Sequence, residues 1–219
     1  MIQIEQTETY GWESAIRGMR NPMNSWDKSD SFWDLTSVDD NYVIGDNDHD
    51  LMMLLAKAGS DHSKFMRMIN VTADITAPLY WWKEYDTYKV GTVANSCSTM
   101  HKIHAKELTL DDFSHEHLIP TGLSQLRRTI ADLNSYREMF IEWDEQSETI
   151  RAAFGNEKKK AWMQMIQLLP TSYNQKRTVQ LNYAVLRNMY HSRKNHKLDE
   201  WRAFCEWVET LPYAELITE

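Results

Sequence analysis

Apolar side chains recur along this sequence with two different periods, which predict a few strands among many helices. Apolar and polar residues alternate at Ile2 and Ile4, and again over residues 68–75, as in half-buried strands. Longer segments place apolar residues at three- and four-residue steps, as amphipathic helices do. These segments are residues 12–20, 48–58, 79–88, 121–143, 158–169, 178–193 and 198–211.

The same pattern predicts which side chains face the core and where the helices end. Over residues 48–58 the inner face consists of Leu51, Leu54, Leu55 and Ala58, and Gly59 ends the helix. Gly155 ends the helical run that begins at residue 121. Residues 22–45 are predicted to be loop and short helix, and the small polar residues 92–99 a loop. The predicted class is α+β, dominated by helices.

Composition narrows the class of protein further. The chain has 219 residues with only seven Gly and five Pro, which argues against an all-β fold with many tight turns. Its net charge of -8 argues against binding nucleic acid through bulk charge. No apolar run is long enough for a membrane helix, and the first residues do not form a signal peptide. Cys97 and Cys205 make no metal or redox pair motif, so the cytoplasm is the expected compartment.

Three charged or polar groups suggest ligands but have simpler interpretations. Asp46, Asp48 and Asp50 resemble half of a calcium loop, yet Leu51 and Lys57 stand where such a loop needs Gly and Glu. An acidic helix start is therefore favoured. A second group could hold a transition metal, although a solvated loop is favoured; its members are His101, His104, His115 and His117. The basic run 158–160 could contact a phosphate but is more typical of a solvated helix face.

Two further features suggest a nucleotide site. Cys97 lies in the polar segment 92–99, where backbone N–H groups can approach a ligand, although a half-buried small residue is the simpler interpretation. Asn182 and Arg193 are eleven residues apart and share one face of the predicted helix 178–193. An amide and a guanidinium on one face can bind a flat heterocycle and a phosphate or carbonyl. The alternative is an ordinary polar helix surface.

Read in order, three segments resemble the flavin-dependent thymidylate synthases. The first is LLAKAG at residues 54–59 with SKFMR at residues 63–67, which is similar to the family's helix ending in Gly and its S-P-F-E-H stretch. The second, residues 79–100, is similar in layout to the signature R-H-R-x-x-S-x-N-E-x-S-x-R-Y. The third begins at Leu169-Pro170, where Asn182 and Arg193 stand at the family's distances from the Pro. The resemblance implies one helix-dominated domain over residues 1–219 with a small antiparallel sheet.

The sequence also departs from this family at its motif positions. None of the nine defined signature positions is identical in the simplest register, and a one-residue slip would instead match Asn95 and Ser98. Arg67 stands where the family has a flavin-contacting His. Ala184 and Ile166 stand where it has nucleotide-binding Arg residues, so bidentate anion recognition is lost there.

The resemblance implies a set of ligands and site residues. FAD is the expected cofactor, with Arg67 and Asn182 as its binding candidates. A pyrimidine nucleotide such as dUMP, modified at C5 by a methyltransferase reaction, is the expected substrate. Its candidate contacts are Lys89, Asn95, Cys97, Ser98 and Arg193. A folate carbon donor and a homotetramer also follow from the resemblance, and no residue is assigned a catalytic role.

Two alternatives remain open at this stage. The chain is interpreted either as a diverged enzyme of this kind or as a non-catalytic relative that binds a nucleotide or a protein. A third interpretation sets the resemblance aside. It makes the chain a helical adaptor whose aromatic face, residues 80–82 with Tyr85, binds a partner.

Overall fold

The computed structural model describes residues 2–36, 41–154 and 156–219. The chain divides into two compact units. Unit 1 comprises residues 76–83 and 96–177, and unit 2 comprises residues 2–75, 84–95 and 178–219. The predicted helix end at Gly155 lies outside the described residues.

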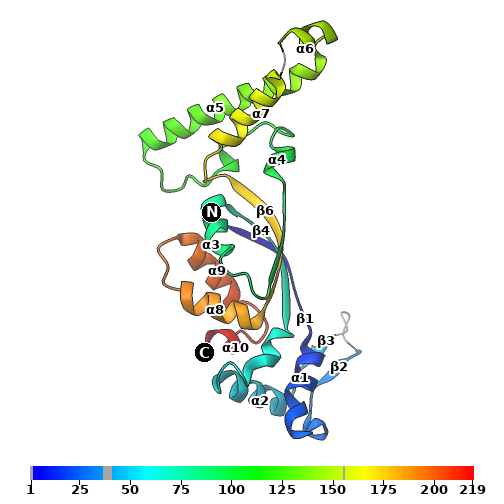
Figure 1. The fold of residues 1–219 in the computed structure, drawn as a ribbon. Coiled ribbons are helices and arrows are strands. Elements are labelled where there is room, and N and C mark those ends of the chain that lie inside the picture. The colour runs from blue at the N-terminus through cyan, green and yellow to red at the C-terminus, as the bar shows by residue number, and fades with distance from the viewer. Residues whose placement is uncertain (1, 37–40, 155) are drawn as a thin grey trace. The chain divides into compact units, whose positions relative to one another are not determined.

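Two sheets are present in the described chain (Figure 1). The larger has the strand order β1-β4-β6-β5, and the smaller pairs β2 with β3. The strands are β1 (Gln3–Tyr10), β2 (Phe32–Asp34), β3 (Asn41–Val43), β4 (Asn70–Pro78), β5 (Thr92–Ser96) and β6 (Asn174–Asn182). Strands β4 and β6 are antiparallel, because Tyr183 donates its N–H to the Ile69 carbonyl while Leu79 donates to the Tyr173 carbonyl.

Helices make up most of the remaining chain, so the predicted helix-dominated α+β class is confirmed. The longer ones are α1 (Trp12–Arg20), α2 (Asp46–Lys57), α5 (Pro120–Glu142), α7 (Glu157–Leu168), α8 (Tyr183–Arg193) and α9 (Asp199–Glu209). The shorter ones are α3 (Leu79–Tyr85), α4 (Thr99–Lys102), α6 (Glu148–Phe154) and α10 (Glu215–Thr218). Single 3-10 turns are η1 (Asn21–Met23), η2 (Trp26–Lys28), η3 (Ser63–Arg67), η4 (Leu110–Asp112) and η5 (Trp143–Glu145).

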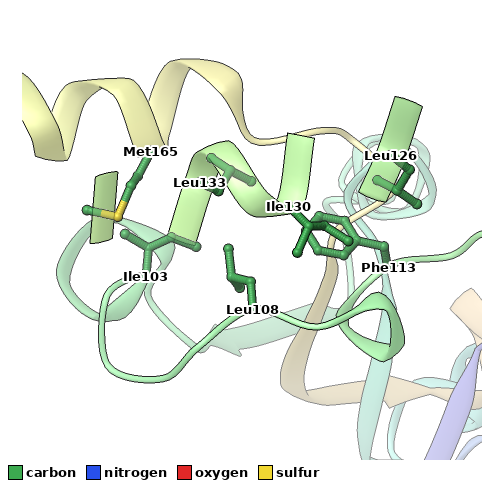
Figure 2. Close-up of a cluster of buried hydrophobic side chains, with 7 residues drawn as sticks. All are labelled: Ile103, Leu108, Phe113, Leu126, Ile130, Leu133 and Met165. Atoms are coloured by element: carbon green, nitrogen blue, oxygen red, sulfur yellow. The ribbon is translucent and has the colours of Figure 1, made fainter. Parts of the chain in front are cut away.

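Unit 1 has its own apolar core, built where α5 and α7 pack side by side (Figures 1 and 2). In the predicted helical segment 121–143, apolar residues at three- and four-residue steps are buried on α5; they include Leu126, Ile130 and Leu133. Met165 of α7 and Phe113 complete this layer with Ile103 and Leu108. The helical period of residues 121–143 therefore predicted the face that builds this core.

In unit 2, alternate side chains of β4 and one face of α9 are buried. Ile69, Val71, Ala73 and Ile75 are at most 1% exposed, as their alternation predicted. In α9, which lies in the predicted helical segment 198–211, the apolar residues at helical spacing are also buried; they are Trp201, Phe204, Cys205 and Val208.

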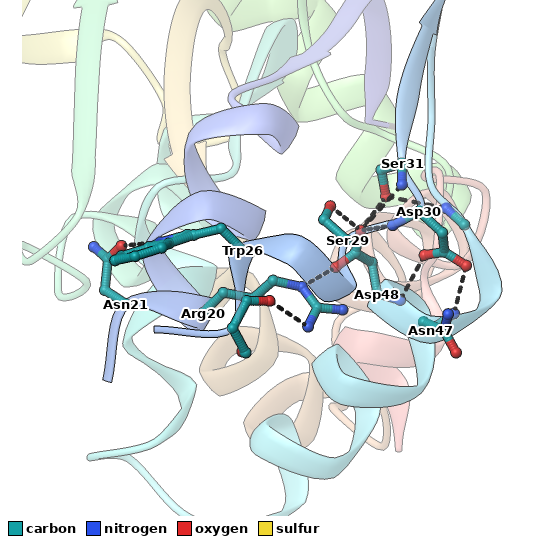
Figure 3. Close-up of polar contacts among 10 residues, drawn as sticks. Arg20, Asn21, Trp26, Ser29, Asp30, Ser31, Asn47 and Asp48 are labelled. Carbon is teal, nitrogen blue, oxygen red and sulfur yellow. Dashed lines mark hydrogen bonds and ion pairs between the residues drawn. The ribbon is translucent and has the colours of Figure 1, made fainter. Parts of the chain in front are cut away.

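A buried charged network fixes the segment between α1 and α2 (Figure 3). Asp48 is fully buried and accepts hydrogen bonds from Arg20 Nε at 2.6 Å and from the hydroxyls of Ser29 and Ser31. Asp30 accepts hydrogen bonds from the backbone N–H groups of Asn47 and Asp48, which are among the unpaired donors at the start of α2. Within the acidic run, Asp48 is thus structural, and it gives the calcium-loop resemblance no support.

The prediction of the inner face of α2 is wrong, because a different face of this helix is buried. Its buried residues are Asp48, Met52 and Ala56, whereas Leu54 is 66% exposed. The hydrogen bonds to Asp48 explain this difference. Five donors satisfy its carboxylate, so the face of α2 that carries Asp48 can be buried in place of the face that carries Leu54. Gly59 does follow this helix with φ of 100°, as predicted.

Other local predictions need correction as well. The polar segment 92–99 contains strand β5, and residues 32–43 contain the paired strands β2 and β3 rather than loop and short helix. The helix predicted from residue 178 begins only at Tyr183, because the preceding residues belong to β6. The proposed adaptor face is core, since Trp81, Trp82 and Tyr85 are at most 2% exposed.

No helix in the described part of the chain is both long enough and apolar enough to cross a membrane.

Candidate functional site

In unit 1, the segment that carries Cys97 and Ser98 is held by the buried side chain of Gln175. The Gln175 amide donates from Nε2 to the Cys97 carbonyl at 2.7 Å, and the Cys97 N–H donates to the Lys176 carbonyl at 2.9 Å. Ser98 begins α4, where its hydroxyl accepts the His101 N–H. Both Cys97 and Ser98 are exposed, so a ligand can reach them.

Gln175 is itself fixed by aromatic and cationic neighbours in unit 1. Trp82 Nε1 donates to the Gln175 carbonyl at 2.9 Å, and Arg177 Nε donates to its Oε1 at 3.0 Å. The Arg177 guanidinium lies 4.2 Å from the centre of the Trp82 ring, a cation–π distance. These contacts therefore fix the position of Gln175, the residue that holds the Cys97 segment.

A pocket of about 380 Å³ follows this segment in unit 1, and we call it the lysine pocket. It is lined by Met100, His101, His104, Phe140, Asn156, Lys158, Lys159 and Trp162. Trp162 Nε1 donates to the Met100 carbonyl at 2.9 Å, which ties α7 to α4. Its volume falls in the range typical of small-molecule sites.

The lysine pocket combines positive charge with aromatic surface. Lys158 lies 4.7 Å from the centre of the Phe140 ring, and His104 lies 4.5 Å from the same ring. Lys160 of the same run pairs instead with Glu157. Two ammonium groups beside aromatic rings suit an anion that also carries a flat ring.

In unit 2, Arg193 at the end of α8 is part of a tight polar cluster. Its NH1 donates to Glu84 Oε2 at 2.8 Å, and its Nε donates to the Tyr88 hydroxyl at 2.9 Å. Trp201 Nε1 donates to the same Glu84 oxygen, and the guanidinium lies 4.8 Å from the Trp201 ring centre. The side chain is 19% exposed, so much of its charge already has partners within the chain.

Asn182 stands at the opposite end of α8 and serves as its cap. Its Oδ1 accepts the Val185 N–H at 2.9 Å. Its Nδ2 lies against Gly91, where a Cβ would come within 2.5 Å of this nitrogen and where φ is 79°. A glycine is therefore required at position 91 for both sterics and backbone conformation.

The remaining candidates are exposed side chains of unit 2. Lys89 is in the turn before β5, Asn95 is on β5, and Arg67 ends η3. The turn over residues 88–91 connects two of the predicted positions, since it contacts Arg193 through Tyr88 and Asn182 through Gly91. Cys97 and Ser98 belong to unit 1, so the predicted residues fall into two groups.

Comparison with solved structures identifies the fold. A crystal structure of thymidylate synthase X from Helicobacter pylori with FAD and dUMP matches 100% of this chain and 97% of its own, with a TM-score of 0.64 and 16% identity. A second Helicobacter pylori structure, a flavin-dependent thymidylate synthase complexed with FAD and dUMP, matches 98% of this chain and 97% of its own, with a TM-score of 0.64 and 17% identity. The fold is that of the flavin-dependent thymidylate synthases. No protein-family model matches the sequence, and no curated protein is similar to it.

On this thymidylate synthase fold, sequence reasoning missed the two lysines that line the lysine pocket. The run 158–160 was interpreted as a solvated helix face. Lys159 and Lys160 are exposed, as this interpretation expects, but Lys158 and Lys159 also line the pocket with His101 and His104. The signal was the helical spacing of Lys158 and Trp162, which puts both on one side of α7. Within the described ranges, no three His, Cys, Asp or Glu side chains are arranged to hold a metal ion.

Proposed function

We propose that this protein binds FAD and a pyrimidine nucleotide as a diverged relative of the flavin-dependent thymidylate synthases. The observation that carries the proposal is the fold shared over the whole length of both chains with proteins crystallised with FAD and dUMP. Fold alone does not fix function, so the proposal also needs groups that suit these ligands.

The residues present fit the chemistry of both ligands. A nucleotide phosphate suits the ammonium groups of Lys158 and Lys159, and a pyrimidine ring suits the aromatic rings of Phe140 and Trp162. For the flavin, the Arg67 guanidinium and the Asn182 amide are hydrogen-bond donors, which suit a pyrophosphate and ring carbonyls. Lys89, Asn95, Cys97, Ser98 and Arg193 remain proposed nucleotide contacts.

The proposal also includes a reaction, the methylation of the bound nucleotide. Reduced FAD, when bound, would supply a hydride for methylation of dUMP or a related nucleotide, with a folate as carbon donor. The protein's own task is to hold the nucleotide and exclude water, and no side chain is assigned as acid or base. We further propose a homotetramer, and a reducing compartment such as the cytoplasm because Cys97 and Cys205 are both free thiols.

A non-catalytic relative is the second candidate, and the state of Arg193 favours it. This guanidinium is already paired with Glu84 and Tyr88, so a nucleotide would have to compete with these partners. A nucleotide sensor binds its ligand without turnover. A protein that lacks the family's signature residues suits that role.

The first test is the visible spectrum of the purified protein after FAD is added and the free cofactor is removed. A retained flavin band supports the cofactor site, and its absence at excess FAD contradicts it. Turnover of dUMP with FAD, a reductant and methylenetetrahydrofolate then separates the enzyme from the non-catalytic relative.

A matched pair of lysine variants tests the nucleotide site. We expect Lys159→Gln to weaken dUMP binding about tenfold in calorimetry, because it removes one charged hydrogen bond to phosphate. Lys160→Gln is the control, since Lys160 belongs to the same run but pairs with Glu157 outside the pocket. Equal effects of the two variants would contradict the assignment of the phosphate to this pocket.

Thiol labelling tests the proposed contact of Cys97. Burial and the nearby carboxylates of Glu209 and Glu206 raise the pKa of Cys205 to about 11, so iodoacetamide should label only the exposed Cys97 in the folded protein. Saturating dUMP should slow this labelling. An unchanged rate would remove Cys97 from the nucleotide site without affecting the lysine pocket.

A further inference from the structure

Unit 2 contains a second cavity, of about 610 Å³, whose wall is mostly aromatic. Its rings come from the end of β1, the start of α1, the paired strands β2 and β3, and the segment before α10. We call it the aromatic cavity, and its rings are Tyr10, Trp12, Trp33, Tyr42 and Tyr213. Every lining residue belongs to unit 2, so this site is separate from the lysine pocket of unit 1.

Four of the five rings are held in two edge-to-face pairs. Trp33 and Tyr42 have ring centres 5.1 Å apart at 64°, and Trp12 and Tyr213 have ring centres 5.2 Å apart at 65°. The buried Trp12 also meets Tyr183 edge to face at 5.2 Å, which anchors it in the core. Such pairs fix ring orientation, so the wall exists before any ligand arrives.

The backbone is unusual at two points of this wall. Gly11 has φ of 95°, and a Cβ there would lie 2.1 Å from the Met68 carbonyl oxygen, so only glycine allows the turn between Tyr10 and Trp12. Tyr213 has φ of 52°, a conformation that is rare for an aromatic residue. Uncommon backbone of this kind concentrates at binding sites.

The charge of the wall has one sign. Glu13 is its only charged residue among those described, since the other lining residues are Thr9, Gly11, Ser14, Pro212 and the five aromatics. Its Oε2 accepts a hydrogen bond from Trp33 Nε1 at 3.2 Å, which turns the carboxylate toward the rings. Its Oε1 lies 3.8 Å from Arg17, but both of these side chains are more than half exposed, so the pair is weak.

We propose that the aromatic cavity binds a quaternary or trimethylated ammonium group. Ring faces carry negative potential and attract a cation, and a methylated ammonium loses little hydration when it leaves water. The carboxylate of Glu13 adds charge complementarity, and the negative net charge of the chain attracts cations to the surface. The group is carried either by a small molecule of the choline type or by a trimethylated lysine of a peptide.

Choline and its neutral carbon isostere, in which a tert-butyl group replaces the trimethylammonium group, test this proposal. We expect saturable binding of choline, followed by calorimetry and tryptophan fluorescence, and about tenfold weaker binding of the isostere. Equal binding of the two would show a merely apolar cavity and overturn the proposal, as would no binding of choline and of a trimethyllysine peptide.

Matched tryptophan variants locate the site. Trp33 is 50% exposed and Trp26 is 51% exposed, but only Trp33 lines the cavity. Trp33→Leu should weaken binding about tenfold, and Trp26→Leu should leave it unchanged. Glu13→Gln should also weaken binding, with Glu8→Gln on β1 as its control. Equal losses in a variant and its control, with folding verified by circular dichroism, would overturn the assignment.

A short peptide with one trimethyllysine distinguishes the two sources of the ligand. Tighter binding of the peptide than of choline supports a methylated protein partner, and the reverse supports a small molecule. The unmethylated peptide should bind at least about tenfold more weakly than the trimethylated one. Equal binding of both peptides would contradict the proposed recognition.

Discussion

Asp48 is a charged side chain that has no contact with solvent. Only its hydrogen-bond donors within the protein can therefore compensate for the lost hydration of the carboxylate. Burial raises the pKa of Asp48, but the hydrogen bonds from Ser29, Ser31 and Arg20 and the charge of Arg20 outweigh it. The net result is a pKa below the ordinary value of 3.8. The folded state therefore binds this proton less readily than the unfolded state does.

The sign of the pH dependence follows from this lowered pKa. The stabilisation by ionised Asp48 is present above the ordinary pKa and is lost as the pH falls through the lower folded-state value. We expect Asp48→Asn to lower the free energy of unfolding by about 3 kcal/mol at pH 7. The loss should shrink in acid. Urea unfolding at several pH values measures this, with Asp50→Asn, an exposed acid of the same helix, as the control that should change little. An equal loss in the control would contradict the role of the network.

The polar cluster around Arg193 makes a second prediction at the level of one residue. Arg193→Ala leaves Glu84 with fewer partners, which costs about 2 kcal/mol for a partly exposed pair. Urea unfolding should detect this loss. Arg17→Ala is the matched control, because its pair with Glu13 is exposed and should change stability by less than about 0.5 kcal/mol. An Arg193→Ala protein as stable as the control would show that this cluster contributes nothing to folding.

At the level of the element, the residue that caps the start of α8 is also a proposed ligand contact. Asn182 accepts the Val185 N–H through Oδ1, and its amide nitrogen is the group proposed to reach the flavin. We expect Asn182→Ala to lose about 1 kcal/mol of stability and Asn182→Asp to lose almost none, because aspartate is an equally good cap. Thermal unfolding measures the two variants.

The aspartate variant also separates folding from ligand binding. Asn182→Asp retains the cap but has no amide donor, so a flavin contact at this position predicts weaker FAD binding in a stable protein. Undiminished FAD affinity in Asn182→Asp would remove Asn182 from the flavin site and leave it as a cap only.

The elements that the sequence predicted well are those whose periodic pattern decides their packing. α1, α5, α7 and α9 and the inward residues of β4 follow from spacing, since apolar burial is their main interaction. The failures have other causes. β5 is exposed along most of its length, so it shows no apolar alternation, and the last residues of β6, 178–182, have a pattern that fits either period.

The residues of the candidate site remain a prediction, and the contacts around two of them could not be predicted from spacing. The eleven-residue interval between Asn182 and Arg193 was interpreted as one helix face. The two residues do stand about 16 Å apart along α8, but Asn182 has extended backbone and caps the helix, so only Arg193 lies on the helix itself. Their partners Gly91, Tyr88 and Glu84 are about a hundred residues away in the sequence. Spacing within one segment cannot reveal such partners.

At the level of the whole molecule, the same strands contribute residues to both compact units. The chain passes between unit 1 and unit 2 within β4, α3 and β5 and at β6. We therefore propose that residues 1–219 unfold as one domain, and we expect a single calorimetric transition whose calorimetric and van't Hoff enthalpies agree. Two resolved transitions would contradict this.

Association is the second property of the whole molecule. Several large apolar side chains remain exposed, including Val90 at 86%, Ile119 at 68% and Leu54 at 66%. These residues belong to both units, and single exposed apolar side chains are common on monomers, so the proposal of a homotetramer rests on the resemblance to the flavin-dependent thymidylate synthases. Light scattering during gel filtration should give about four times the chain mass of 25.9 kDa, and a monomer mass would contradict the proposed tetramer.

The contact between Gly45 and Asp30 limits how this sequence can vary. A Cβ at position 45 would lie 2.2 Å from the Asp30 carboxyl carbon and 2.6 Å from its backbone oxygen. Any substitution of the glycine must displace the group that caps α2, and with it the loop that surrounds Asp48. In a library of random variants, position 45 should therefore retain glycine even where position 30 changes, because the backbone oxygen of residue 30 stays in place whatever side chain that residue carries.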